Sequence, residues 1–200
     1  MQPWQPLLDF WFGDDSADAP RAARQAPLWW GKSSETDALL THRFGELAQG
    51  AAEGELAHWA EVPVGRLALI LLLDQLPRNI HRAAPAAFAQ DARARDLCLR
   101  GLSLGADKAL SPLARVFFYL PLEHAESREQ QARSVALFEG LAAEQADGPA
   151  RETFAGFADF ARRHQVIVER FHRFPHRNAI LGRQDTAEEA AFLLQPGSGF

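Results

Sequence analysis

The fold class that the sequence predicts is all-α, built from antiparallel helix pairs. Apolar residues recur at steps of three and four along most of the 200 residues, which is the spacing of one helical face, whereas alternation at period two is nearly absent. Helix-capping residues and prolines precede several of these stretches. The connections are short and none has the composition of a domain linker, so we expect one compact domain over residues 1–200.

Each expected helix has its own pattern. Residues 67–73 are apolar without interruption, which predicts a helix over 64–75 that is buried on nearly all sides. Ser111 is a favourable N-cap, and Pro112 follows at the first helical position of the next clear helix. Thr186 and Glu189 have the spacing of a capping box. Further helices are expected over 35–48, 86–100, 124–146, 150–171 and 187–194.

Two similar segments follow apolar helices, and each has an Arg-Asn pair shortly after a proline. The first reads Leu-Pro-Arg-Asn-Ile over 76–80, and the second reads Phe-Pro-His-Arg-Asn-Ala-Ile over 174–180. Proline disfavours helical geometry in the residue before it, because its ring crowds that residue's backbone. We therefore expect both segments to be sharp turns.

Composition excludes several classes of partner and fixes the expected compartment. The net charge of −5 gives no overall attraction to nucleic acid or to anionic lipid. The longest apolar run has seven residues, against the ~20 that a membrane-spanning helix needs. A single cysteine, Cys98, and the absence of a signal-peptide pattern over residues 1–12 favour a reducing cytoplasm. We expect neither nucleic acid nor a membrane as partner.

Asp74 is the first candidate for a functional residue. It follows the apolar run and lies on the helical face of Leu67, Ile70 and Leu71, so we expect its carboxylate to be at least partly buried. A buried carboxylate needs a partner, and the candidates are the arginines at 78, 82 and 177. Such a pair could stabilise a turn or form part of a ligand site, and the sequence leaves both interpretations open.

Two histidines also lie on apolar helical faces. His124 extends by one turn the stripe that begins at Leu113, and Glu123 precedes it. His164 lies on the apolar face of the helix expected over 150–171. A histidine in such a position is either a hydrogen-bonded core residue or an acid/base catalyst.

Basic residues are concentrated near the end of the chain. Residues 162–183 contain six arginines and one acid, Glu169, which leaves about +5 in an acidic protein. Arg183 also precedes the helix expected at 187, whose amide-rich N-terminus favours anions. The segment could bind an anion, or its arginines could pair with acids elsewhere on a solvated face.

Other chemistries lack their sequence patterns. His172 and His176 have the helical spacing of two metal ligands, but Pro175 interrupts that helix, and no cysteine pair is present. The sequence also has no glycine-rich phosphate loop, no Gly-x-Ser-x-Gly elbow and no dinucleotide fingerprint. We expect no metal and no cofactor.

Long stretches of the chain resemble the bacterial family catalogued as domain of unknown function 924. The matching stretches are LDFWFG at 8–13, Trp29-Trp30 with Lys32, LILLLDQLPRNIHR at 69–82, FFYLPLEHAE at 117–126 and RFHRFPHRNAILGR at 170–183. The resemblance implies a tetratricopeptide-like superhelix of stacked helix pairs and establishes no activity, substrate or cofactor. Ala125 stands where the family pattern has serine, and His172 where it has glycine.

Two functions fit these observations. In the first, polar side chains converge on one site that binds an anionic or polar small molecule and acts on it by acid/base chemistry. Its predicted catalytic residues are Asp74, Glu123 and His124, and its predicted ligand-binding residues are Arg78, Asn79, Arg82, His164, His176, Arg177, Asn178 and Arg183. In the second, a tetratricopeptide-like adaptor binds a peptide or protein in a tryptophan-lined groove, and the polar motifs only stabilise turns.

Overall fold

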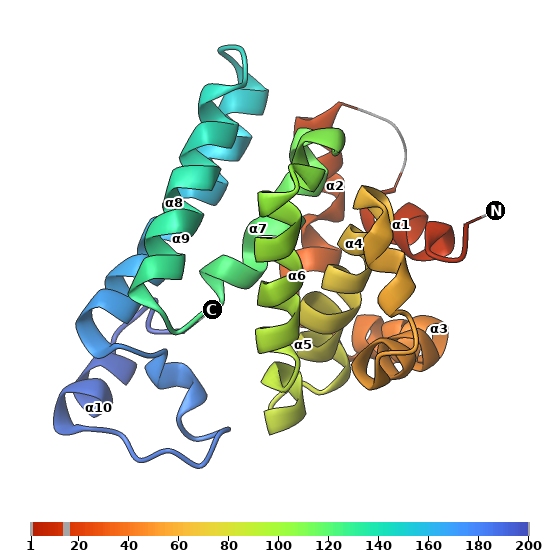
Figure 1. Cartoon of the computed structure of the whole chain (residues 1–200). Coiled ribbons are helices and arrows are strands. Elements are labelled where there is room, and N and C mark those ends of the chain that lie inside the picture. Colours follow the sequence, from red (N-terminus) through yellow and green to blue (C-terminus); the bar gives the residue numbers. More distant parts are fainter. Residues whose placement is uncertain (1, 14–16, 200) are drawn as a thin grey trace.

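Helices make up all the regular secondary structure of residues 2–13 and 17–199, which are the residues described by this computed structural model (Figure 1). The all-α prediction is confirmed. Residues 1, 14–16 and 200 of the domain expected over 1–200 lie outside the described residues. In chain order the α-helices are α1 (Gln5–Phe12), α2 (Asp18–Trp30), α3 (Ser34–Glu53), α4 (Pro63–Ile70), α5 (Leu76–Ile80), α6 (Asp91–Ser103), α7 (Pro112–Glu123), α8 (Arg128–Ala143), α9 (Pro149–Phe171) and α10 (Ala187–Leu193).

Each helix expected from the sequence is present, some with different ends. The helix expected over 124–146 begins at Arg128, because the Ser127 side chain accepts a hydrogen bond from the Gln130 amide and caps it. The helix expected over 86–100 is a short 3₁₀ turn, η3 (Pro85–Phe88), followed by α6. The capping box at Thr186 and the N-cap at Ser111 are both present.

The sharp turn expected at 76–80 is wrong, because the helix continues through it. After α4 the chain widens into one π-helical turn, η2 (Leu71–Gln75), in which the Leu76 amide bonds to the Leu71 carbonyl, and α5 follows directly. An α-helical Pro77 would press its ring against the carbonyl four residues back and leave that carbonyl without a donor. The wider turn relieves this crowding, and π turns of this kind often occur at functional sites.

The second proline segment does form a sharp turn. α9 ends at Phe171, and His172 takes a left-handed conformation with φ of 61°. The chain then passes through the 3₁₀ turn η5 (Pro175–Arg177) before α10. This path returns residues 174–178 toward the end of α9.

No helix was expected before residue 35, yet α1 and α2 are both there. α2 buries only Ala22 and Trp29 of its thirteen residues, so its sequence has little apolar periodicity to detect. The short α1 buries Leu7, Leu8 and Trp11. Both helices are therefore stabilised mainly by tertiary packing, which cannot be predicted from the local sequence pattern.

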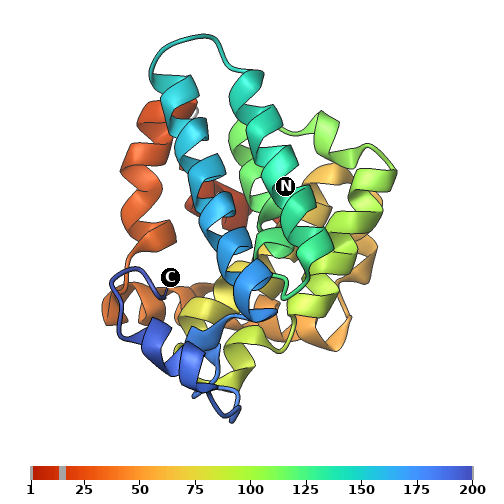
Figure 2. The same cartoon turned by 90° about the vertical axis from the view of Figure 1, so that its left-hand side faces the viewer.

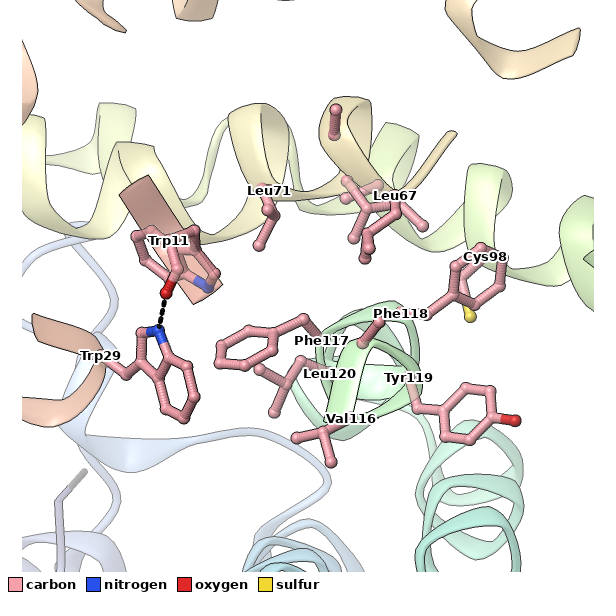
Figure 3. Packing of buried hydrophobic residues seen from close by; sticks show 14 of the residues in the cluster. Trp11, Trp29, Leu67, Leu71, Cys98, Val116, Phe117, Phe118, Tyr119 and Leu120 are labelled. Atoms are coloured by element: carbon pink, nitrogen blue, oxygen red, sulfur yellow. Dashed lines mark hydrogen bonds between the residues drawn. The ribbon is translucent and has the colours of Figure 1, made fainter. Parts of the chain in front are cut away.

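The core lies between α7, the rod formed by α4 and η2, and the first two helices (Figure 3). The ring of Phe117 on α7 lies edge-on to Trp11 and Trp29, with centroid distances of 5.6 and 4.7 Å. Trp29 Nε1 donates a 2.9 Å hydrogen bond to the Trp11 carbonyl. Leu67 and Leu71 are buried above these rings, as the apolar run at 67–73 predicted.

α8 and α9 form an antiparallel pair that covers one side of this core (Figure 2). A small separate cluster of Ile167, Val168 and Phe174 anchors the final turns and α10. The prediction of antiparallel pairs is thus met by α8 and α9, whereas the tetratricopeptide-like superhelix stays a prediction. Among the described residues, no helix combines the length and the apolar character needed to cross a membrane.

Candidate functional site

The centre of the polar cluster is Asp74, in the widened turn η2, whose side chain is fully buried. His124, which follows α7, places Nδ1 2.8 Å from Oδ1 and 2.9 Å from Oδ2 of this carboxylate. Arg78, one turn further along the rod, has Nη1 3.4 Å from Oδ1, and Gln75 Nε2 donates to Oδ2 at 2.6 Å. These donors offset the cost of removing a carboxylate from water.

The contact with Asp74 defines how His124 is protonated. An ionised carboxylate only accepts hydrogen bonds, so the shared proton belongs to His124 Nδ1. In the neutral ring the lone pair is then on Nε2. The His124 side chain is 13% exposed and that of Asp74 is fully buried, so the histidine is the more exposed member of the pair.

Two arginines share Asp91, the first residue of α6. Arg78 binds it through both terminal nitrogens, with Nη1–Oδ1 and Nη2–Oδ2 distances of 3.0 Å. Arg177 Nη1 lies 3.3 Å from Oδ2, and its guanidinium lies over the rings of Phe88 and Phe174, at 4.7 and 4.5 Å from their centroids. The protein therefore supplies its own anion to the two arginines that were expected to bind a ligand.

The side chain of Glu123 contacts His164 and not His124, which follows Glu123 in the sequence. His164 Nδ1 donates to the Phe160 carbonyl at 2.9 Å and lies 3.2 Å from Glu123 Oε1. The His164 ring is 6.2 Å from the ring of His124, centroid to centroid. Two acid–histidine pairs thus lie side by side, Asp74 with His124 and Glu123 with His164.

The surroundings separate the pKa values of the two acids. Burial alone acts to raise the pKa of Asp74, but the charge of Arg78 and the hydrogen bonds from His124 and Gln75 outweigh it and hold that pKa well below its usual range. Burial, reinforced by the charge of Asp74, raises the pKa of Glu123 to about 8. At neutral pH one carboxyl is ionised and the other holds a proton, which is the arrangement that acid/base chemistry uses.

The histidines of the cluster are neutral at pH 7. Burial and then the charge of Arg78 lower the pKa of His124, against the opposing effect of Asp74. Burial lowers the pKa of His164 to about 3, assisted by His124. His176 lies in the same region, and burial and then Arg177 lower its pKa to about 4.

Asn79 and Arg82 belong to a second group at the start of α3. Arg82 binds Asp37 through Nε at 2.7 Å and Nη2 at 2.8 Å, and Asn79 Nδ2 donates to the same carboxylate at 3.0 Å. These bonds join α5 to the N-terminal turn of α3. They therefore connect two helices. Their acceptor, Asp37, belongs to a group separate from the one around Asp74.

Asn178 and Arg183 belong to a third group in the final turns. Arg183 binds Glu126 through Nη1 at 2.7 Å and Nη2 at 2.8 Å, and its Nε donates to Asn178 Oδ1 at 2.9 Å. Glu126 also accepts the Phe174 amide at 2.8 Å. The group joins the segment after α7 to the segment after α9 and stabilises both.

Neither of two surface cavities, of about 210 and about 240 Å³, is lined by a residue of the predicted site. Access to the central cluster is greatest at Arg78 and Asp91, whose side chains are about one-fifth exposed.

Among residues 2–13 and 17–199, no group of three or more His, Cys, Asp or Glu side chains is placed to hold a metal ion. Of the tryptophans proposed to line a groove, Trp11, Trp29 and Trp59 are buried, and Trp30 is 47% exposed.

The sequence-based prediction of the site missed four residues that take part in these three groups: Asp37, Phe88, Asp91 and Glu126. Asp91 is 86 residues from Arg177 and 13 from Arg78, and the helix expected over 86–100 would have made it an ordinary surface acid. Because a buried arginine needs a carboxylate partner, the sequence indicates that some acids must pair with these arginines. The sequence does not show which acids they are, because the pairing depends on how distant helices pack.

Fold and site together define an all-α protein with a buried network of acids, arginines and histidines where α5, α6, α7 and the turn after α9 meet. The chain belongs to the family described as bacterial protein of unknown function (DUF924), whose model matches residues 7–197. It is similar to the solved structure of the protein of unknown function ATU0120 from Agrobacterium tumefaciens, with 37% sequence identity and a TM-score of 0.74 over 89% of this chain and 99% of that chain. No curated protein matches the sequence.

Proposed function

We propose that the cluster around Asp74 is a small-molecule site in which His124 acts as a general base. The observation that supports this proposal is the pair of contacts from His124 Nδ1 to both Asp74 oxygens, at 2.8 and 2.9 Å. The carboxylate orients the ring, and Nε2 is the atom that takes a proton from the ligand. Asp74 also stabilises the imidazolium that results.

Glu123 is the proposed acid. Its pKa of about 8 means that it still holds its proton at neutral pH, whereas Asp74 does not. Two carboxyl groups in different protonation states provide an acceptor side and a donor side within one cluster. His164 holds the Glu123 side chain in place through the 3.2 Å contact.

The charges of the cluster favour a polar ligand over a strongly anionic one. At neutral pH the negative charges of Asp74 and Asp91 balance the positive charges of Arg78 and Arg177, because the three histidines and Glu123 are neutral. A carboxylate or phosphate ligand has to replace Asp91 at the two arginines. A hydroxyl or carbonyl compound needs no such exchange, and this is the substrate class that we propose.

A thermal-shift panel tests the proposal, because a ligand that binds only the folded state raises the Tm. The panel contains neutral hydroxylated, carbonyl, carboxylated and phosphorylated metabolites, and each is measured with the wild type, His124→Gln and His81→Gln. His81 is an exposed histidine at the end of α5, so its replacement is a matched control. We expect neutral polar compounds that raise the Tm of the wild type and of the control but not of His124→Gln.

Nitrogen-15 spectra of the histidine rings test the mechanism separately. In the wild type His124 is expected to carry its proton on Nδ1, and Asp74→Asn should disturb that tautomer because an amide also presents a donor. A proton found on Nε2 in the wild type would contradict a general-base role. So would a panel without hits, or hits that His124→Gln retains.

A further inference from the structure

A cavity of about 240 Å³ lies beside the central rod, between the 3₁₀ turn η1 (Ala57–Glu61) and α6. Leu69 and Leu73, both 3% exposed or less, contribute apolar surface to it. Arg93, Asp96 and Arg100 on α6 provide its charged groups. None of these residues takes part in the contacts of the proposed catalytic cluster.

A buried arginine lies behind this cavity. Arg66 on α4 is 7% exposed, and its Nη1 and Nη2 donate to the carbonyls of Leu97 and Ala60 at 3.1 and 2.6 Å. Both of those residues line the cavity, so the guanidinium joins its two walls. Among the described residues Arg66 has no carboxylate partner, and its buried Nε has no hydrogen-bond partner.

A buried charge without a counter-charge is unusual, because burial then costs more than two carbonyl contacts return. Here a second arginine makes the balance worse: burial first and then the charge of Arg100 lower the pKa of Arg66. Arg93 also belongs to the cavity, although its guanidinium already donates to the Ala52 carbonyl. The lining residues Arg93, Asp96 and Arg100 have one positive charge in excess, and Arg66, bonded to the lining residues Ala60 and Leu97, adds a second in a chain of net charge −5.

We propose that this cavity binds a small amphipathic anion, a carboxylate on a short apolar chain. The carboxylate supplies the negative charge that the arginines lack, and the chain lies against Leu69, Leu73 and Leu97. The volume is below the ~300–1,000 Å³ of typical ligand pockets, which limits the ligand to a chain of a few carbon atoms. The site is separate from the proposed general-base cluster and does not depend on it.

Hexanoate is the probe for this site, with hexanol as its uncharged equivalent and acetate as its short equivalent. In ¹H–¹⁵N spectra of the whole protein, hexanoate should give saturable shifts at the amides of Ala57, Ala60 and Leu97, with a Kd in the millimolar range. Loss of one charged hydrogen bond typically weakens binding by about tenfold or more. Hexanol is therefore expected to bind about tenfold more weakly than hexanoate. Acetate keeps the carboxylate but lacks most of the apolar chain, so it is also expected to bind at least about tenfold more weakly.

Variants on α6 separate the site from general surface charge. Arg100→Gln should weaken hexanoate about tenfold and leave hexanol unchanged, whereas Asp96→Asn should strengthen hexanoate by about threefold. Arg133→Gln is the control, because it removes one exposed arginine charge from α8, outside the cavity. Replacement of Arg66 is avoided, since that side chain joins three elements and its loss can unfold the protein.

Three results would overturn the proposal: shifts that stay linear with hexanoate through the millimolar range, equal effects of Arg100→Gln and Arg133→Gln, or equal affinity for hexanoate and hexanol. His124→Gln should leave hexanoate binding unchanged. Failure of this site would therefore leave the general-base proposal intact, and failure of the general-base proposal would leave this site intact.

Discussion

The stability of the protein should depend on the protonation of Glu123, and Glu123→Gln tests this. The side chain is 5% exposed, and its pKa rises from the usual 4.5 to about 8 in the folded protein. Between these two values the folded protein holds one more proton at this carboxyl than the unfolded chain does. The free energy of unfolding therefore falls as pH rises through this interval.

The size of the effect follows from the pKa difference. One pKa unit corresponds to about 1.4 kcal/mol, so a rise of about 3.5 units gives a loss of about 5 kcal/mol between pH 4.5 and pH 8. The contribution is fully present below pH 4.5, about 3 kcal/mol is lost by pH 7, and the loss is complete above pH 8. Glutamine keeps the side-chain shape and an acceptor for His164 but does not titrate.

Urea unfolding followed by tryptophan fluorescence measures the difference, since Trp11 and Trp59 are buried. All other titrating groups are shared by the two proteins and cancel. We expect the free energy of unfolding of Glu123→Gln minus that of the wild type to increase by about 4 kcal/mol from pH 5 to pH 8. Glu129→Gln, the same change at an exposed position on α8, should follow the wild type. A difference that does not change with pH refutes an elevated pKa at Glu123.

Four further substitutions test the packing of the network and of the helices. Asp74→Ala removes the acceptor of a buried arginine and histidine and should cost about 3–5 kcal/mol in chemical denaturation; a loss below about 1 kcal/mol would contradict a central role for this carboxylate. Arg177→Ala, at a side chain 7% exposed and paired with an acid on α6, should lower stability by roughly 2 kcal/mol or more in circular dichroism melts, and an unchanged Tm would show that the pair contributes nothing. Gly101→Ala would place its Cβ 2.4 Å from the Phe118 ring and should cost about 1–3 kcal/mol, whereas Gly140→Ala, with open space around its Cβ, should stabilise α8 by up to ~1 kcal/mol. Equal effects of these two glycine substitutions in the same melts would contradict the close contact between Gly101 and Phe118.

The helices were predictable where their formation is local. The cap at Ser111, the capping box at Thr186 and the uninterrupted apolar run at 67–73 each act within a few residues of where they stand. α1 and α2 were not predictable in this way, since α2 has few buried residues and depends on contacts with α7 and α9. The continuation of the helix through Pro77 was missed because a widened turn removes the steric conflict on which the expectation rested.

The residues of the candidate site were also predictable only in part. Asp74, Arg78 and His124 were selected because polar residues next to apolar helical faces must be buried or paired, and Arg78 and His124 both contact Asp74. Asn79 was selected from the Arg-Asn pair after Pro77 and Arg183 from its place before the helix at 187, yet they contact Asp37 and Asn178 in other parts of the molecule. Adjacency to a buried helix indicates that a side chain needs a partner, but it contains no information on which partner lies within reach.

The sequence by itself determined the helical class, most helix positions, and the need for carboxylates and arginines to be buried together. Those properties follow from periodicity, capping and the cost of burying charge, all of which act through neighbouring residues. Only the tertiary structure decided that Asp91 forms ion pairs with both Arg78 and Arg177. It also decided that Glu123 contacts His164 and that Arg66 has no carboxylate partner among the described residues. These outcomes depend on how α4, α6, α7 and the turn after α9 pack, over separations that reach 86 residues, and side-chain pairing at that range is set by the geometry of the folded chain.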